Sequence, residues 1–372
     1  MLLLLLLLFI NIFTEDKIFQ WAVVGAGPAG ITAISVLLES GVDSQDISWI
    51  DPSFAVGNLS LYPEVPANTA VLDFLNFFRD CKYFKVAEKI YNKLENQDFE
   101  PYLKDIIAPL QAITFYLKSL TNSKVGFVTK LEYQDDWHIF INGKKDLISK
   151  NVILAMGSYP VELNNNKAKT IPLEVALNKD SIAGYLKPED TVVVYGNSHS
   201  AILVLKNLSE LNINKIINIY KHELVYCDFS FDPPIYQGSG LKGLAARWAK
   251  EFLETNLISN LTKIKLEDLD QNVLESADKI IYAIGFKPNL IENIEIKEYK
   301  AGEIASGLFG LGIAFPETII DQSGSTEQLI GLDSFMNYAR NNLPNFINKR
   351  DKLGSINYYN LDNLIKISLF AQ

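Results

Sequence analysis

The sequence predicts an α/β fold made of two parallel-sheet units, with the second unit inserted into the first. Three observations lead to this fold class: a glycine-rich turn between an apolar strand and a helix near the N-terminus, a second such turn near the middle of the chain, and an antiparallel stretch between them. A chain of 372 residues has room for two to three domains. The formal net charge of −10 and the lack of a Lys/Arg block argue against a nucleic-acid partner.

Cysteine and histidine are scarce in the chain. The two cysteines, Cys81 and Cys227, form no Cys-x-x-Cys pair, which excludes a disulfide scaffold, a Cys-rich zinc module and a redox pair of that type. Three histidines leave little for a His-based metal site, so no metal is expected. We therefore expect a bound cofactor to supply most of the chemistry.

The chain begins with a leucine-rich run. Residues 1–13 are mostly apolar, but they fall short of the ~20 residues that span a bilayer, and the basic start and small-residue cleavage site of a signal peptide are missing. We expect residues 1–16 to be an N-terminal apolar extension without structural consequence, and the protein to be cytoplasmic. The alternative is a weak membrane tether formed by residues 1–13.

The first glycine-rich turn has the surroundings of a dinucleotide site. Residues 19–24 read as a buried strand and residues 31–39 as a helix. The G-x-G-x-x-G turn between them consists of Gly25, Ala26, Gly27, Pro28, Ala29 and Gly30. Its glycines permit a tight turn, the approach of a pyrophosphate and close packing of helix on strand. A second strand, residues 47–50, ends at Asp51, about twenty residues further on, where an acid would accept hydrogen bonds from a ribose.

The second glycine-rich turn follows a β-branched strand at residues 191–195 and leads into a helix. The turn consists of Gly196, Asn197, Ser198, His199 and Ser200. Ser198 stands where the motif has its second glycine, so its side chain adds bulk where a pyrophosphate comes closest, although its hydroxyl could donate a hydrogen bond. His199 is expected to be a surface residue at the helix start, with a contact to phosphate or nicotinamide as the alternative.

Basic residues follow the next strand, residues 215–219. Lys221 lies where an NAD-binding protein would carry an acid, and basic character there suits a ribose 2′-phosphate. NADPH is therefore favoured as the second nucleotide, with NADH as the alternative. An exposed lysine at a strand end is the competing interpretation of Lys221.

The stretch between the two turns predicts an antiparallel β-meander. Residues 125–152 alternate short β-prone runs with turns, and Asn142-Gly143 is a strong hairpin signal. The last of these runs ends in Ala155-Met156-Gly157, and a similar segment, Ala283-Ile284-Gly285, closes the second unit.

These motifs together resemble the two-dinucleotide-binding-domain flavoproteins, a superfamily that contains the pyridine nucleotide-disulfide oxidoreductases and the flavin-dependent monooxygenases. The resemblance implies FAD on the first turn and NAD(P)H on the second, with Ala155, Gly157 and Gly285 in the two hinges between domains. It also implies two Rossmann-like domains. The expected boundaries are residues 17–185 and 296–372 for the FAD-binding domain and residues 186–295 for the inserted NAD(P)-binding domain.

The resemblance extends to the expected surroundings of the flavin. Asn68 and Thr69 are implied as contacts of the ring, unless this stretch is an ordinary Pro-punctuated loop. The family's Gly-Asp pair, whose Asp hydrogen-bonds the ribityl chain, is Gly312-Ile313 here. FAD would then be held by backbone groups near Gly312, with Glu317 as a substitute acid. Residues 331–342 read as a closing helix whose start would face the pyrimidine end of the flavin.

The resulting expectation is an FAD-dependent oxidoreductase that is reduced by NAD(P)H, in a monooxygenase-like form. Its substrate or electron acceptor would be a small molecule that the sequence leaves unnamed, and no catalytic acid, base or nucleophile stands out. Residues 228–253 are the candidate for a substrate-facing region, with a connecting loop and a packing helix as the alternative. The altered positions Ser198 and Ile313 motivate a rival function, a non-catalytic flavin-binding protein that responds to redox state through interactions.

Overall fold

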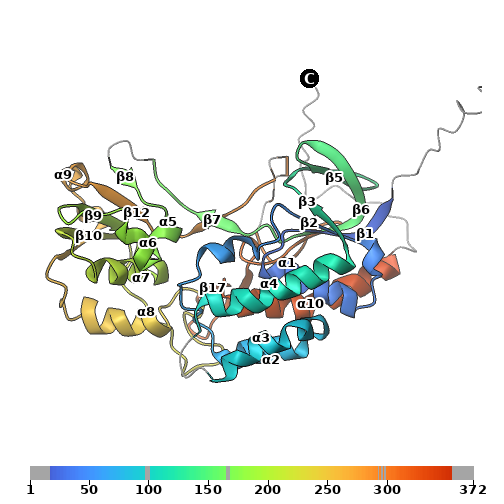
Figure 1. Ribbon diagram of the computed structural model, residues 1–372, viewed down its shortest axis with the longest axis horizontal. Coiled ribbons are helices and arrows are strands. Elements are labelled where there is room, and N and C mark those ends of the chain that lie inside the picture. Colours follow the sequence, from blue (N-terminus) through green and yellow to red (C-terminus); the bar gives the residue numbers. More distant parts are fainter. Residues whose placement is uncertain are drawn as a thin grey trace, which may run out of the picture.

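The computed structural model describes residues 17–96, 101–164, 168–291, 293–294, 296 and 299–353. The predicted N-terminal extension, with its leucine-rich run, lies outside the described residues, as do residues 354–372 of the predicted FAD-binding domain. Two sheets organise the chain, and each forms a unit with the helices that cover it (Figure 1). Among the described residues, no helix combines the length and the apolar character needed to cross a bilayer.

The first unit is built on an eight-stranded sheet whose main path is β14-β15-β6-β1-β2-β3. Its strands are β1 (Ile18–Val24), β2 (Ile47–Asp51), β3 (Asn122–Val125), β4 (Val128–Gln134), β5 (Asp136–Ile141), β6 (Lys144–Leu154), β14 (Gly302–Ala305) and β15 (Leu308–Gly310). β1 lies between β2 and β6 and is parallel to both, so the first glycine-rich turn leaves the middle of the sheet.

The antiparallel meander is confirmed. β4 pairs with β5 and β5 with β6, and both pairings are antiparallel. Asn142 and Gly143 connect β5 to β6 with φ angles of 51° and 79°. Positive φ at both central residues is what the favoured two-residue hairpin turn requires, and it explains the Asn-Gly sequence.

Helices cover the face of the first sheet that lies opposite the core of the meander. They are α1 (Pro28–Glu39), α2 (Val71–Asp80), α3 (Glu88–Tyr91), α4 (Leu103–Leu120) and α10 (Leu332–Leu353). Their apolar faces form one core with the sheet, whereas the meander forms a second core on the opposite face. The predicted closing helix is present as α10.

The second unit is built on a parallel five-stranded sheet in the order β11-β10-β9-β12-β8. Its strands are β8 (Lys169–Thr170), β9 (Thr191–Tyr195), β10 (Lys215–Tyr220), β11 (Leu261–Lys265) and β12 (Lys279–Tyr282). Its helices are α5 (Leu173–Ala176), α6 (Lys179–Ala183), α7 (His199–Ser209), α8 (Gly243–Trp248) with a π-helical turn at Ala249–Leu253, and α9 (Gln271–Glu275). Residues 169–183 thus contribute a strand and core side chains to the second sheet, ahead of the boundary expected at 186.

Two short strands join the units. β7 (Ser158–Pro160) pairs antiparallel with β13 (Phe286–Pro288), and Figure 1 shows β7 between the two sheets. A separate hairpin, β16 (Glu317–Ile320) and β17 (Thr326–Leu329), precedes α10. The strands of the first sheet therefore come from both sides of the second sheet in sequence.

Candidate active site

Steric contact fixes the first and third glycines of the first turn. Gly25 has a φ of +110°, and a Cβ atom there would lie 2.2 Å from the carbonyl oxygen of Ala155. A Cβ atom on Gly30 would lie 2.0 Å from the carbonyl oxygen of Gly25. Both positions therefore exclude any side chain, because the obstructing atoms belong to the backbone.

A side chain on Gly27 would point into open space and not into the protein. The nearest atom to a Cβ on Gly27 would be the Val56 carbonyl oxygen, 3.9 Å away. Helix α1 starts at Pro28 with no side-chain cap and no acid in its first turn, so its N-terminal N–H groups and its positive dipole end are free of a competing carboxylate. An FAD pyrophosphate fits this position, because a bare glycine and a helix N-terminus are what an approaching phosphate group needs.

Asp51 shapes the turn in addition to bordering the cleft beside it. Its side chain is 5% exposed and accepts hydrogen bonds from the backbone N–H of Ala26 at 2.7 Å, of Ser53 at 2.8 Å and of Phe54 at 2.7 Å. Charge-assisted bonds of this kind hold the carboxylate at the carboxyl end of β2. The contact with a ribose stays a prediction.

The second turn repeats the backbone arrangement of the first. Gly196 has a φ of +121°, and its Cβ atom would lie 2.1 Å from the carbonyl oxygen of Ala283. A neighbouring-strand side chain caps each turn from the same side: the indole Nε1 of Trp49 donates to the Gly25 carbonyl at 2.9 Å, and the amide Nδ2 of Asn218 donates to the Gly196 carbonyl at 2.8 Å. Two unrelated side chains thus make the same hydrogen bond.

Three of the residues predicted around the second turn differ in their surroundings. The Asn197 amide donates to the carbonyl of His222 at 2.9 Å, which ties the turn to the segment after β10. Ser198 is exposed at the N-cap of α7 and makes no side-chain cap, so its hydroxyl is available to a ligand. Lys221 is exposed and does not line the cleft between the units.

His199 departs from the expectation of a surface histidine. It is half-buried, and its Nε2 accepts a hydrogen bond from the backbone N–H of Lys242 at 3.0 Å. Burial, with a smaller contribution from the Lys242 ammonium, lowers the pKa of His199 from 6.5 to about 4. Its ring is therefore neutral at pH 7 and acts as a hydrogen-bond acceptor for the loop that ends at Lys242.

A single cleft of about 1250 Å³ borders both turns. The predicted residues that line it are Gly25, Gly27, Pro28, Asp51, Asn68, Thr69, Ala155, Gly157, His199, Ser200 and Ile313. Those that do not line it are Ala26, Ala29, Gly30, Gly196, Asn197, Ser198, Lys221, Gly285 and Gly312. Gly285, in the second hinge, has a φ of +102°.

The residues that are expected to surround the flavin ring lie where the start of α10 meets the loop before α2. The Thr69 hydroxyl donates to the Asp333 carboxylate at 3.1 Å, and both residues line the cleft. Ile313 also lines it, and a Cβ on Gly312 would lie 2.7 Å from the Cβ of Ala29 in α1. Glu317, the expected substitute acid, begins β16 and is not among the described residues that line the cleft, so its contact with the ribityl chain stays a prediction.

Several residues of the cleft have no counterpart among the predicted site residues. Asn289 follows β13, donates to the Met156 carbonyl at 2.7 Å and lines the cleft. Arg247 lines it from α8, and Lys242 lines it from the residue before that helix. Phe229, Gln237 and Gly238 line it from the preceding loop. The interpretation of residues 228–253 as a region that faces the site is therefore supported. Its proline- and glycine-rich composition was the signal available in the sequence.

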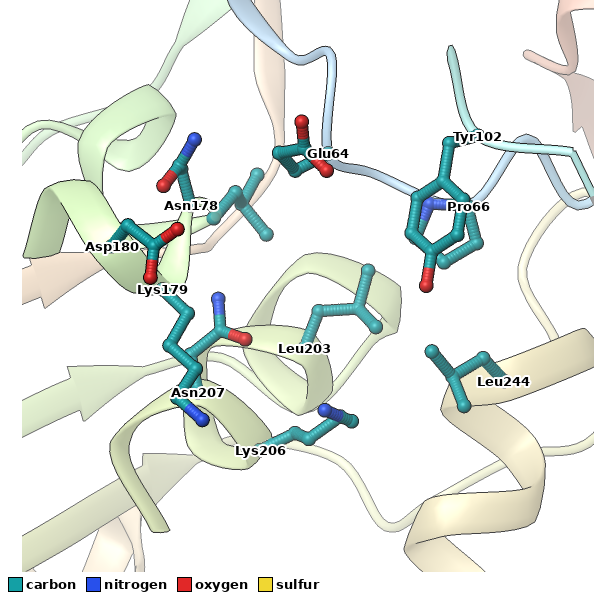
Figure 2. Close-up of a pocket in the computed structure, with 11 residues that line it drawn as sticks. Glu64, Pro66, Tyr102, Asn178, Lys179, Asp180, Leu203, Lys206, Asn207 and Leu244 are labelled. Carbon is teal, nitrogen blue, oxygen red and sulfur yellow. The ribbon is translucent and has the colours of Figure 1, made fainter. Parts of the chain in front are cut away.

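A smaller cavity of about 260 Å³ also lies between the units (Figure 2). Glu64, Pro66 and Tyr102 of the first unit face Leu203, Lys206 and Leu244 of the second. The amines of Lys179 and Lys206 both contact the Glu210 carboxylate at 2.6 Å, which lowers the pKa of that carboxyl group. Because their charges are already paired, these lysines do not form an anion site.

Comparison with known proteins places the chain in a family. The model of the pyridine nucleotide-disulphide oxidoreductase family matches residues 19–306, which include both glycine-rich turns and both hinges. The chain belongs to this family. It is a flavin-dependent oxidoreductase with the two-domain, Rossmann-like fold of the flavoproteins, and the resemblance stated from its motifs is confirmed.

Three similar proteins illustrate the range of this flavoprotein fold. Monooxygenase AgnR1 of Paecilomyces divaricatus is 29% identical over 384 residues, which cover 87% of this chain and 97% of that protein. The FAD-bound cadaverine monooxygenase DfoA of Erwinia amylovora has a TM-score of 0.62 at 10% identity, covering 91% of this chain and 95% of its own. The ornithine N-hydroxylase of Kutzneria sp. 744, with reduced FAD, NADP+ and L-ornithine, has a TM-score of 0.60 at 14% identity, covering 91% and 100%. The rival function without catalysis finds no support in these relatives, which are named as enzymes.

Proposed function

We propose that this flavoprotein is an NADPH-dependent monooxygenase that uses FAD to oxidise a small organic molecule. The observation that carries the proposal is the single cleft that borders both glycine-rich turns, because hydride transfer requires the two nucleotides to meet in one water-excluded space. FAD, when bound, supplies the chemistry by accepting a hydride and passing the electrons to oxygen. The protein has to bind and orient the two nucleotides and the substrate.

The cysteines argue against electron transfer to a protein thiol. No cysteine is among the described residues that line the cleft. Cys81 is 1% exposed, and burial, assisted by nearby carboxylates, raises the pKa of its thiol to about 12. A thiol that is buried and protonated is a poor nucleophile. The relatives that are named as monooxygenases support molecular oxygen as the acceptor.

The rim of the cleft favours an organic substrate with apolar surface. Leu61, Phe229, Phe286, Leu290 and Ile330 line the cleft and are between 39% and 67% exposed. Exposed apolar side chains gathered at one cleft indicate a binding surface. They would cover an apolar substrate and keep water away from the flavin.

Basic side chains around the second turn favour NADPH over NADH. Lys242 and Arg247 line the cleft near Ser200, while Lys221 lies outside it directly after β10. Lysine and arginine supply the positive charge that a ribose 2′-phosphate needs. The two lysines mark two alternative places for this phosphate.

Anaerobic reduction of the FAD-loaded, full-length protein tests the proposal. We expect NADPH to bleach the flavin absorbance at least about tenfold faster than NADH at equal concentration. Admission of oxygen without substrate should then return the oxidised flavin and release hydrogen peroxide. Flavin that stays oxidised under excess of either nucleotide contradicts the proposed function.

Matched lysine variants locate the 2′-phosphate. Lys221→Ala or Lys242→Ala should raise the half-saturating NADPH concentration about tenfold while leaving that for NADH unchanged. Lys242→Ala keeps the backbone N–H that donates to His199, so the loop stays attached. If neither variant separates NADPH from NADH, the preference for NADPH is wrong.

A further inference from the structure

A loop of the second unit is hydrogen-bonded to a hairpin of the first unit. The loop is residues 228–240 and the hairpin is β16–β17; we refer to the pair as the clasp. The backbone N–H of Tyr236 donates to Asp321 Oδ2 at 3.2 Å, and that of Gly238 donates to Glu327 Oε2 at 3.1 Å. The Ser239 hydroxyl donates to Glu327 Oε1 at 3.0 Å.

Among the described residues, Glu327 has no side-chain partner outside the loop. Its side chain is 7% exposed, and no ion pair with it occurs among the described residues, so both of its oxygens accept only from the loop. Asp321, which is 4% exposed, differs because it also accepts from Ser323 and Ser325 within its own turn. A buried carboxylate needs hydrogen-bond donors to offset the loss of its hydration, and for Glu327 these come entirely from the other unit.

The two parts of the clasp are in close backbone contact. A Cβ atom on Gly238 would lie 2.2 Å from the carbonyl oxygen of Gln328 and 2.9 Å from Glu327 Oε2. Tyr236 has a φ of 57°, a conformation that non-glycine residues adopt only when their surroundings hold them. The hydrogen bond to Asp321 supplies part of that hold.

Both parts of the clasp line the cleft that borders the two glycine-rich turns. Phe229 and Gly238 line the cleft from the loop, Leu329 lines it from the hairpin, and Ile330 lines it directly after the hairpin. Two residues beyond the loop, Lys242 donates its backbone N–H to His199 at the start of α7. One continuous segment therefore connects the second turn to the first unit.

We propose that Glu327 is a positioning residue, which holds loop 228–240 on the hairpin and so keeps the second unit at the distance and angle that hydride transfer to the flavin requires. The proposal rests on the proposed function for its kinetic consequence. Glu327 would act through the loop and would not touch substrate or cofactor. Its loss should lower the rate of the transfer step and leave nucleotide binding nearly intact, because the second turn itself is unchanged.

Two variants break the clasp by different means. Glu327→Ala removes the acceptor, and Gly238→Ala pushes the loop away from the hairpin without changing any charge. In the FAD-loaded, full-length protein, each should lower the limiting rate of anaerobic flavin reduction by NADPH about tenfold or more. The half-saturating NADPH concentration should change less than about threefold. Glu327→Gln, which keeps one acceptor oxygen, should restore part of the rate.

Thr326→Ala is the matched control, because Thr326 is the exposed neighbour of Glu327 on β17. It should reduce at the wild-type rate. If Glu327→Ala and Gly238→Ala retain FAD and also reduce at that rate, Glu327 has no positioning role. The same conclusion follows if the half-saturating concentration rises while the limiting rate stays constant.

Amide hydrogen exchange of the wild-type protein tests the clasp without a variant and without nucleotide reduction. Peptides that cover residues 228–240 should exchange slowly, and Glu327→Gln should accelerate their exchange. Fast exchange in the wild type would refute the clasp even if both alanine variants fail to fold. Slow exchange in a protein that NADPH does not reduce would leave the clasp standing and reject the proposed function.

Discussion

Gly25 and Gly196 solve the same packing problem in the two units. Each lies where a strand ends, has a positive φ and faces the carbonyl oxygen of a hinge alanine at a distance that no Cβ atom tolerates. The glycine therefore permits the tight turn, and it also lets the backbone of the hinge alanine lie directly against that turn. The space above the turn, toward Gly27, is then left for a ligand.

A comparison of alanine variants at Gly25 and Gly41 separates the cost of backbone strain from the cost of steric contact. Gly41 also has a positive φ, +89°, but a Cβ there would meet nothing within 4 Å. Gly41→Ala should cost about 1 kcal/mol of the free energy of unfolding, from the left-handed conformation alone. Gly25→Ala should cost at least about 2 kcal/mol more and abolish FAD retention, because it displaces Ala155. Urea unfolding and the flavin content of the purified proteins measure both effects, and equal costs for the two variants would contradict this account.

The neutral ring of His199 predicts a loss of stability in acid. Its pKa is lowered from 6.5 to about 4, so between these values the unfolded chain binds a proton that the folded protein does not. The free energy of unfolding should therefore fall as the pH drops from about 6.5 to about 4, by at most about 3 kcal/mol from this group.

His199→Gln should remove this part of the pH dependence, because an amide oxygen can still accept from Lys242 but does not titrate. His222→Gln serves as the control, since the side chain of His222 is exposed and only its carbonyl bonds to Asn197. Urea unfolding at pH 4.5 and pH 7 provides the comparison. Wild-type pH dependence in the His199 variant would assign the effect to other groups.

Residues whose position follows from spacing along the chain could be predicted, and contacts between remote residues could not. The places of Gly25 and Asp51 follow from a strand–turn–helix unit of known dimensions, although the contact of Asp51 with a ribose stays a prediction. The role of His199 depends on a backbone N–H that lies 43 residues away in sequence. Glu327 pairs with a loop 89 residues away, and no local pattern marks such a pairing.

At the scale of elements, aromatic side chains hold the helices between β2 and β3 together. Phe78 of α2 is fully buried, and its ring centroid lies 5.4 Å from that of Tyr91 and 5.7 Å from that of Phe84. Phe74 and Phe77 complete the cluster at 6.4 Å and 6.3 Å from Phe78. Helix α2, which carries three of these rings, directly follows the loop with Asn68 and Thr69.

Phe78→Ala should lower the free energy of unfolding by about 4 kcal/mol, because it leaves a cavity in this cluster. Phe115→Ala is the matched comparison, since Phe115 lies on α4 and is 63% exposed, and it should change stability by less than about 0.5 kcal/mol. Denaturant unfolding measures both variants. Similar losses in the two would show that the cluster is not a cooperative part of the fold.

The elements that the sequence did not reveal have physical reasons for being hidden. Helix α4 contains Pro109, a residue that usually argues against a helix interior. The strands β16 and β17 are four residues each and pair only with one another. β8 has two residues and gains its place in the second sheet only by pairing with β12. β1, α1 and β9 are predicted close to their observed bounds, because each of them flanks a glycine-rich turn.

At the scale of the whole molecule, the two units have separate cores that share no buried residue, and Tyr62 and Val65 of the first unit pack against a core of the second. The cores of the first unit lie on both faces of the eight-stranded sheet, and those of the second unit lie on both faces of the five-stranded sheet. The hinge strands and the clasp are the main hydrogen-bonded links described between them. Separate cores predict separate unfolding.

Calorimetry should therefore show two thermal transitions in the FAD-free protein. FAD should raise the midpoint of one transition only, because its predicted contacts lie mostly in the first unit, and a concentration of 100 Kd contributes about 2.7 kcal/mol. NADPH should then act mainly on the other transition. A single transition that FAD shifts as a whole would mean that the clasp and hinges couple the units into one cooperative block.

Trp49 and Asn218 have a consequence for how this chain avoids misassembly. A protein with two similar strand–turn–helix units risks pairing the second strand of one unit with the first strand of the other during folding. The hydrogen bond above each turn is the same, but one donor is a bulky indole and the other a small amide. Pairing of β2 with β9 would place the indole in a space shaped for an amide, and pairing of β10 with β1 would leave a void where the indole belongs. The difference in size between the two side chains thus favours pairing of β2 with β1 and of β10 with β9.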